Sequence, residues 1–248
     1  MTDAASKPRA LLLDIEGTVT PISFVHDILF PFAQAHVRDY LLGHSMRDEV
    51  EEDTKALFRE YLVDQEKGEQ PPEIENGVWL IDAIVAYVNW LIERDRKSPA
   101  LKSLQGKIWE QGYRNGSLKA PLFADVVPNL GRLRKQGIGI AIFSSGSVLA
   151  QKLLFAHTET GNHTDLLDQY FDTEVGSKVE SASYAAIAQR LMSSAAEIIF
   201  VSDVTNELKA AREAGMATLL CVRPGNQPQS ACEEFEVIHS FSEILPAA

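Results

Sequence analysis

Residues 10–20, ALLLDIEGTVT, decide the fold of this chain. The apolar first part, with three consecutive leucines, predicts a buried strand of a parallel sheet. The strand runs into Asp14 and Glu16, which the alternation of side chains along a strand places on one face. Acids at the carboxyl end of a parallel strand lie where open α/β sheets bind ligands. Two like charges so close together need a cation or a proton. The stretch therefore predicts a divalent metal site suited to Mg²⁺, unless it is only a polar strand end that turns into a loop.

Composition narrows the class of protein. The 248-residue chain carries a formal net charge of −12, which argues against a nucleic acid or an anionic membrane surface as partner. The two cysteines, Cys221 and Cys232, do not have the spacing of a metal site. The amino terminus lacks the pattern of a signal peptide, and no apolar run is long enough to span a bilayer. We therefore expect a cytoplasmic protein and, because nothing indicates a coiled coil, a monomer.

Roughly a hundred residues after the first strand have helical patterns and no strand signal. Helices are predicted within residues 21–40, 45–67, 78–95 and 98–112, with a loop at 66–77. This is far more chain than a crossover between parallel strands needs. We predict a helical cap domain, residues 21–120, inserted into a core domain formed by residues 1–20 and 121–248.

The second half of the chain alternates strands and helices. Strands are predicted at residues 138–143, 197–201, 217–222 and 236–238, with short extended pieces at 170–172 and 174–176. Helices are predicted at residues 125–136, 148–157, 181–192 and 205–214. Such alternation is typical of the α/β class, here a doubly wound parallel sheet with right-handed crossovers.

Polar groups follow each predicted core strand and suit phosphate chemistry. Asp14 is a candidate nucleophile, because a carboxylate can attack phosphorus and form an aspartyl phosphate. Ser144 and Ser145 precede a predicted helix, where hydroxyls and free N–H groups bind anions. Lys178 follows a short loop and could balance the phosphoryl charge.

A second acidic pair follows the strand at residues 197–201. Asp203 is placed to ligate a metal directly, and Glu207 could do so directly or through water. Taken singly, each of these groups has a simpler explanation, such as a capped turn, a solvated lysine or a capped helix start. Their order along one sheet edge nevertheless favours a joint site.

These motifs resemble the four signatures of the haloacid dehalogenase superfamily. They appear here as DIEGT from Asp14, IFSS around Ser144, the lone Lys178, and SDVTNE around Asp203. Most superfamily phosphatases have aspartate two residues after the nucleophile, whereas this chain has Glu16. The longer runs LLLDIEGTVTPISFVHDILFPF, FADVVP, IFSSGSVLAQKLLF, FDTEVGSKVESASY and VRPGN are similar to those of the enolase-phosphatase E1 family of methionine salvage.

The resemblance implies a two-step reaction. The substrate would be 2,3-diketo-5-methylthiopentyl-1-phosphate, which is enolised and then dephosphorylated to 1,2-dihydroxy-3-keto-5-methylthiopentene, with one Mg²⁺ per subunit. It implies metal ligands at Asp14, Glu16 and Asp203. Superfamily analogy favours the backbone carbonyl of Glu16 over its side chain. Substrate contacts fall on Ser144, Ser145 and Lys178, and the catalytic residues are Asp14, Glu16 and Lys178.

Several alternatives stay open. The chain could be another capped phosphatase acting on phosphoglycolate or a sugar phosphate. A phosphoacceptor signalling domain is disfavoured because such domains lack a long helical insertion. Metal-free dehalogenation is disfavoured because the acids at Asp203 and Glu207 need a counter-cation.

The residues that act on the dicarbonyl part of the substrate are also undecided. The sequence does not identify the base for enolisation. Three residues are candidates for it: Glu16, His26 and Glu110. Four aromatic residues could line the apolar methylthio tail or belong to the core: Phe24, Trp79, Trp109 and Tyr113.

Overall fold

A computed structural model describes residues 8–74 and 77–246. The chain divides into two compact units. The sheet unit contains residues up to 25 and from 119 onward, and the helical unit contains residues 26–118. Within the described part of the chain, no helix combines the length and the apolar character that crossing a membrane requires.

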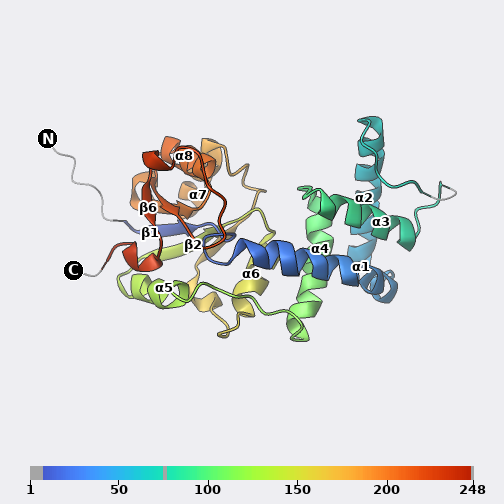
Figure 1. The fold of residues 1–248 in the computed structure, drawn as a ribbon, viewed down its shortest axis with the longest axis horizontal. Helices are drawn as coiled ribbons and strands as arrows, with labels where there is room; N and C mark the ends of the chain where they lie inside the picture. The colour runs from blue at the N-terminus through green and yellow to red at the C-terminus, as the bar shows by residue number, and fades with distance from the viewer. Residues whose placement is uncertain (1–7, 75–76, 247–248) are drawn as a thin grey trace. The chain divides into compact units, whose positions relative to one another are not determined.

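The sheet unit is built on six parallel strands (Figure 1). They are β1 (Ala10–Leu13), β2 (Gly139–Phe143), β3 (Gln169–Phe171), β4 (Ile198–Ser202), β5 (Ala217–Cys221) and β6 (Glu236–Ile238). Their order is β3-β2-β1-β4-β5-β6, and every neighbouring pair is parallel. The order reverses between β1 and β4, which is the switch point where doubly wound sheets bind ligands. The predicted α/β doubly wound class is therefore confirmed.

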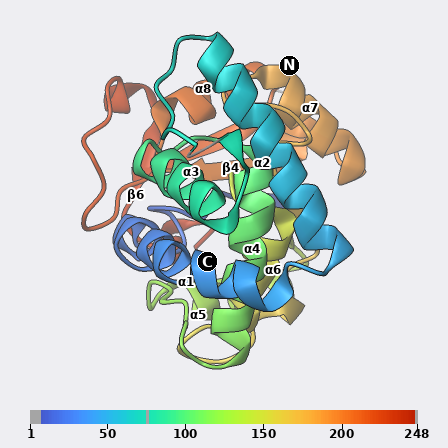
Figure 2. The same ribbon diagram turned by 90° about the vertical axis from the view of Figure 1, so that its right-hand side faces the viewer.

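Helices cover both faces of this sheet. They are α5 (Val126–Lys135), α6 (Val148–Ala156), α7 (Ser181–Arg190) and α8 (Thr205–Glu213). Figures 1 and 2 show α7 and α8 on one face and α5 and α6 on the other. Buried residues of β1, β2 and β4 pack with those of α7 and α8, among them Leu12, Phe143, Phe200, Tyr184 and Leu208. This core holds the strand ends in a fixed register.

Within the described residues, the helical unit contains four α-helices, and a π-helical turn leads into it along the chain. These are η1 (Phe24–Leu29), α1 (Phe30–His44), α2 (Asp48–Glu66), α3 (Ile81–Glu93) and α4 (Pro99–Arg114). Pro31 lies in the first turn of α1, where its missing N–H has no consequence. Asp64 is buried and accepts hydrogen bonds from Tyr87 at 2.7 Å and from Arg96 at 2.8 Å. The unit thus has an apolar core of its own and a buried carboxylate whose two oxygens both accept hydrogen bonds.

Two predicted elements differ from the structure. The predicted helix at residues 78–95 begins only at Ile81, and the side chains of Val78 and Leu80 are 50% and 62% exposed. The predicted extended piece at 174–176 is a turn, because Asp172 accepts a hydrogen bond from the Glu174 N–H at 3.0 Å. Of the predicted loop at 66–77, residues 75–76 lie outside the described residues.

The two segments that flank the helical unit in the sequence are bonded to each other within the sheet unit. Thr20 Oγ1 donates to the Pro121 carbonyl at 2.5 Å, and the Phe123 N–H donates to the Val19 carbonyl at 3.1 Å. The chain therefore leaves the sheet unit and returns to it at adjoining positions.

Candidate active site

Asp14 is the first residue after β1. Its N–H donates to the Val201 carbonyl at 3.0 Å, so the pairing of β1 with β4 continues to this residue. The residue is 4% exposed, and its Oδ1 accepts a hydrogen bond from Lys178 Nζ at 2.5 Å. The predicted nucleophile and the predicted cation thus form a buried ion pair.

Lys178 also pairs with a second carboxylate. Its Nζ lies 2.7 Å from Glu207 Oε2, and Ser202 Oγ donates to the same oxygen at 2.9 Å. Burial alone would lower the pKa of Lys178, but the charges of Asp14 and Glu207 outweigh it and raise that pKa above its usual value. Tyr184 OH donates to the Lys178 carbonyl at 2.7 Å and fixes its backbone. The ammonium is therefore permanently charged and held in one place.

Asp203 follows β4 directly and is 6% exposed. Burial, together with the charges of Asp14 and Glu207, raises the pKa of Asp203 to about 7. Burial likewise raises the pKa of Glu207 to about 7, against the lowering effect of Lys178. Three acidic groups lie around one ammonium here, and the raised pKa values indicate that binding a cation, either a proton or a metal ion, is favourable.

Gly17 brings the loop after β1 against Asp203. The glycine has φ of +70°, and its N–H donates to the Thr20 carbonyl at 2.8 Å. A Cβ added at Gly17 would overlap Asp203 Oδ2 and would lie 2.9 Å from Asn226 Oδ1. Only glycine allows this backbone conformation and this close approach together.

The donor set of this region fits a divalent metal with few protein ligands. Among the described residues, no group of three or more His, Cys, Asp and Glu side chains is arranged to hold a metal ion. Magnesium, however, is commonly bound by one or two carboxylates, with water and substrate oxygens as the other ligands. Asp14 and Asp203 supply the carboxylates, and Asn226 Oδ1 adds a buried oxygen that has no hydrogen-bond partner in the described part of the chain.

Ser144 and Ser145 follow the strand next to β1. The parallel register pairs Leu13 with Ile142, which brings the serines to the level of the loop after Asp14. Ser144 is buried, its N–H donates to the Phe171 carbonyl at 3.1 Å, and its Oγ accepts from the Gly146 N–H at 3.1 Å. Ser145 is half-buried and lies in the turn that leads to α6.

Asp14 and Glu16 do not share a strand face, contrary to the prediction. Strand β1 ends at Leu13, so side-chain alternation does not extend to the acids. The Ile15 carbonyl instead accepts the N–H groups of Thr18, Val19 and Thr20, and the chain turns there. Glu16 is half-buried and forms an isolated β-bridge with Thr20.

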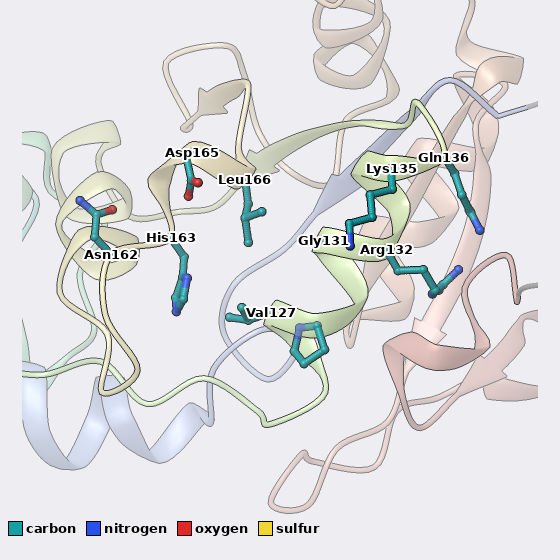
Figure 3. Close-up of a pocket in the computed structure, with 10 residues that line it drawn as sticks. Val127, Gly131, Arg132, Lys135, Gln136, Asn162, His163, Asp165 and Leu166 are labelled. Carbon is teal, nitrogen blue, oxygen red and sulfur yellow. The ribbon is translucent and has the colours of Figure 1, made fainter.

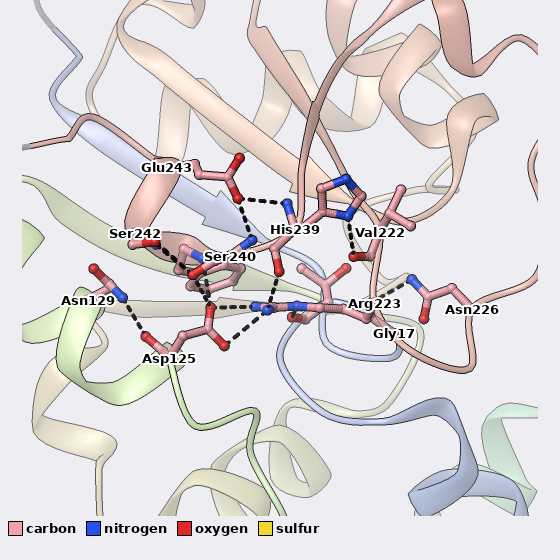
Figure 4. Close-up of polar contacts among 12 residues, drawn as sticks. Gly17, Asp125, Asn129, Val222, Arg223, Asn226, His239, Ser240, Ser242 and Glu243 are labelled. Carbon is pink, nitrogen blue, oxygen red and sulfur yellow. Dashed lines mark hydrogen bonds and ion pairs between the residues drawn. The ribbon is translucent and has the colours of Figure 1, made fainter.

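Sequence reasoning missed two residues that hold this loop. Arg223 is buried, and its guanidinium donates to the Thr18 carbonyl at 3.3 Å and to both Asp125 oxygens at 3.0 Å. Asn226 Nδ2 donates to the Gly17 carbonyl at 3.0 Å (Figure 4). Both residues lie in the run VRPGN, and Asp125 lies in the run FADVVP. These runs support the family resemblance, but nothing in them indicates which residues are in contact.

Other candidates for enolisation and tail binding lie in the helical unit. Glu110 pairs with Arg114 at 2.6 Å, and the His26 ring meets the Phe30 ring edge-on. Trp109 is buried and donates to the Leu29 carbonyl at 2.8 Å, and Tyr113 is buried as well. Trp109 and Tyr113 thus contribute to the core of the helical unit.

A pocket of about 540 Å³ lies elsewhere on the sheet unit. Figure 3 shows its lining, which includes Val127, Arg132, Lys135, His163 and Leu166. These residues belong to α5 and to the segment before β3, and none of them is a predicted site residue. The pocket is separate from the cluster at the carboxyl ends of the strands.

Comparisons with known proteins identify relatives of this chain. The haloacid dehalogenase-like hydrolase family matches residues 8–215. The chain is 49% identical to enolase-phosphatase E1 of Synechococcus elongatus, over 94% of this chain and 96% of that protein. It is 43% identical to a probable bifunctional methylthioribulose-1-phosphate dehydratase/enolase-phosphatase E1 of Vitis vinifera, over 95% of this chain and 47% of that protein.

A solved structure is similar as well. The UTR4 protein of Saccharomyces cerevisiae has a TM-score of 0.74 and 36% identity, and the match covers 96% of this chain and 100% of that one. The family resemblance read from the sequence is confirmed. The chain belongs to the haloacid dehalogenase-like hydrolases and, within them, to the enolase-phosphatase E1 family.

Proposed function

We propose that this chain enolises 2,3-diketo-5-methylthiopentyl-1-phosphate and then hydrolyses the phosphate to give 1,2-dihydroxy-3-keto-5-methylthiopentene. The observation that carries the phosphatase step is the buried ion pair of Asp14 and Lys178 beside Asp203. Family membership carries the choice of reaction.

The fused relative from Vitis vinifera supports the substrate class. Its name joins a methylthioribulose-1-phosphate dehydratase to an enolase-phosphatase E1 part, and this chain covers 47% of its length. Loss of water from a ketose 1-phosphate, followed by tautomerisation, gives a diketone phosphate. A dehydratase of that kind would therefore supply the diketone that the enolase-phosphatase consumes.

Asp14 would perform the phosphoryl transfer as the nucleophile. One of its carboxylate oxygens forms a bond to phosphorus, and the bond from phosphorus to the enol oxygen breaks, with the electron pair leaving on that oxygen. Water then attacks phosphorus, releases inorganic phosphate and restores the Asp14 carboxylate. Lys178 holds Asp14 before attack and offers its charge to the phosphoryl oxygens, where it stabilises the transition state.

The remaining assigned residues would bind the metal and the phosphate. Haloacid dehalogenase-like hydrolases and enolase-phosphatases generally use a divalent metal. Mg²⁺ held by Asp14, Asp203 and the Glu16 carbonyl would supply positive charge that neutralises the phosphate. Ser144 and Ser145, in the turn before α6, would donate hydrogen bonds to the phosphoryl oxygens.

Enolisation requires a base that takes a proton from C1 and a donor that protonates the carbonyl oxygen. We propose Glu16 for proton transfer, because it is half-buried and lies two residues from the nucleophile. We also propose that the helical unit acts as a cap domain that excludes water during transfer. Its insertion directly after the loop that carries Asp14 supports this role.

A substrate panel tests the function. Phosphate release is measured from the diketone phosphate, phosphoglycolate and several sugar phosphates, with and without EDTA. We expect efficient release from the diketone alone, formation of the enediol product, and loss of both with EDTA. Comparable rates on the other phosphomonoesters would favour another capped phosphatase. Full activity in EDTA would contradict the metal assignment.

A further inference from the structure

Asn226 has a side chain whose orientation is fixed by two carbonyls. Its Nδ2 donates to the Gly17 carbonyl at 3.0 Å (Figure 4) and also to the Cys221 carbonyl at 3.3 Å. Because carbonyls only accept, the amide nitrogen must face them, and this settles which end of the carboxamide is Oδ1. Asn226 thus joins the segment after β5 to the loop after β1, with Oδ1 pointing away from both carbonyls.

Asn226 Oδ1 lies beside a second acceptor oxygen. It is buried and has no hydrogen-bond partner within the described residues. The place that a Gly17 side chain would take is bordered by Asn226 Oδ1 at 2.9 Å and, more closely, by Asp203 Oδ2. A carboxylate oxygen and an amide oxygen are both hydrogen-bond acceptors. A buried pair of this kind is unfavourable unless a donor or a cation serves both oxygens.

We propose that Asn226 is a positioning residue of the metal site, whose Oδ1 accepts a hydrogen bond from a water of the hydrated divalent cation held by Asp203. The inference rests on the proposed metal-dependent function and adds a residue to it. Mg²⁺ dehydrates reluctantly and keeps several waters, so its site needs acceptors for those waters as well as direct ligands. Partners of this kind orient the bound ion and its ligands.

A purely structural role would use only half of the carboxamide. The contacts of Nδ2 to Gly17 and Cys221 tie the two loops together without any need for a buried acceptor on the other side. Gly17 lacks the side chain that would otherwise collide with Asp203 and lie against Asn226 Oδ1. Asn226 Oδ1 and the absent side chain of Gly17 therefore border the same position beside Asp203.

The test is a calorimetric titration of Mg²⁺ alone into the full chain after treatment with EDTA and dialysis. For Asn226→Ala we expect the Kd for Mg²⁺ to rise about ten- to a hundredfold, as for other partners of metal ligands. The matched control is Asn129→Ala. Asn129 Nδ2 also donates to a backbone carbonyl, that of Asp125 at 2.8 Å, and its loss should leave the Kd unchanged. An unchanged Kd in Asn226→Ala would overturn the proposal.

A second variant separates the acceptor from the structural contact. Asn226→Asp keeps an oxygen toward Asp203 but loses the donor to Gly17, so it should bind Mg²⁺ more tightly than Asn226→Ala. Equal weakening in both variants, or failure of both to fold, would assign Asn226 a structural role only and overturn the inference.

Kinetics give an independent readout. Raising the Mg²⁺ concentration should restore much of the kcat lost in Asn226→Ala, which a misfolded loop would not allow. Lack of Mg²⁺ binding or of phosphate release by the wild-type chain would contradict the proposed function itself. If the wild type is active and binds Mg²⁺, and Asn226→Ala has the same Kd for Mg²⁺ and the same kcat, only the inference on Asn226 is contradicted.

Discussion

Lys178 Nζ lies 2.5 Å from Asp14 Oδ1 and 2.7 Å from Glu207 Oε2, in the interior of the sheet unit. One ammonium thus joins a residue that follows β1 to a residue of α8, which follows β4. Asp203 adds a further carboxyl group, so the cluster holds more acidic groups than basic ones. This charge balance underlies the first two predictions.

Replacing Asp14 by asparagine should abolish phosphate release and leave the fold intact. Asparagine has the same shape but cannot attack phosphorus as a carboxylate does, and Glu207 still pairs with Lys178. Activity on the diketone phosphate and circular dichroism of the same sample check this. Turnover near that of the wild type would remove Asp14 from the role of nucleophile.

Replacing Lys178 by alanine should lower kcat/KM by about a hundred- to a thousandfold, the usual effect of losing one transition-state donor. The free energy of unfolding should fall by about 3 kcal/mol, because buried carboxylates lose their partner. Steady-state kinetics and urea unfolding measure the two effects.

A surface lysine provides the control for Lys178. Lys209 on α8 pairs with Glu234 at 3.6 Å in an exposed position, and Lys209→Ala should change stability by less than about 0.5 kcal/mol. An unaltered kcat/KM in Lys178→Ala would refute its contact with the phosphoryl group.

Replacing Gly17 by alanine should reduce kcat by about a hundredfold, because the new Cβ would displace Asp203 from its place beside the loop. Gly137→Ala separates this effect from backbone strain. Gly137 has a similar φ of +82°, but nothing lies within 4 Å of an added Cβ. It should therefore lose only about 1 kcal/mol of stability and keep its activity. Equal activity of the two variants would show that the close approach to Asp203 has no functional role.

The ion pair of Asp125 and Arg223 should make stability depend on pH in acid. Burial would raise the pKa of Asp125, but the hydrogen bonds from Arg223 and from the Phe241 amide hold it below its ordinary value. A carboxyl with a lowered folded-state pKa stabilises the fold above its unfolded-state pKa, and this contribution disappears as pH falls through the folded-state value.

The variant Asp125→Asn measures that contribution. At pH 7 it should lose about 3 kcal/mol of unfolding free energy, because the buried Arg223 keeps its charge without a partner. The difference from the wild type should shrink as pH falls below about 4. The exposed Asp165→Asn should show neither effect in the same urea titrations. A difference that stays constant down to pH 3 would contradict the assigned charge state.

Most of the sheet could be predicted because its strands are short apolar runs that end in polar residues. The positions of Asp14 and Asp203 followed from the same pattern, since parallel strands bring their carboxyl ends to one edge, whereas Lys178 was predicted from its place after a short loop. The contacts of Arg223 and Asn226 could not be predicted. Their partners are the carbonyls of Thr18 and Gly17, 205 and 209 residues away. Every residue has such a carbonyl, so no side chain marks the partner in the sequence.

Periodicity misled at two element boundaries, the start of α3 and the end of β1. The apolar Val78 and Leu80 fit the helical pattern of α3, yet they precede its first turn and are exposed. Alternation was likewise applied to Glu16, although the chain leaves the strand after Leu13. Both errors concern element boundaries, where the local pattern continues after the hydrogen bonding has changed.

The hydrogen bonds from Thr20 to Pro121 and from Phe123 to Val19 close the polypeptide on itself at the base of the inserted helices. The segment between Thr20 and Pro121 can therefore change in length or sequence during evolution without displacing Asp14. Such changes would leave the pair of Asp14 and Lys178 in place, because both residues belong to the sheet unit.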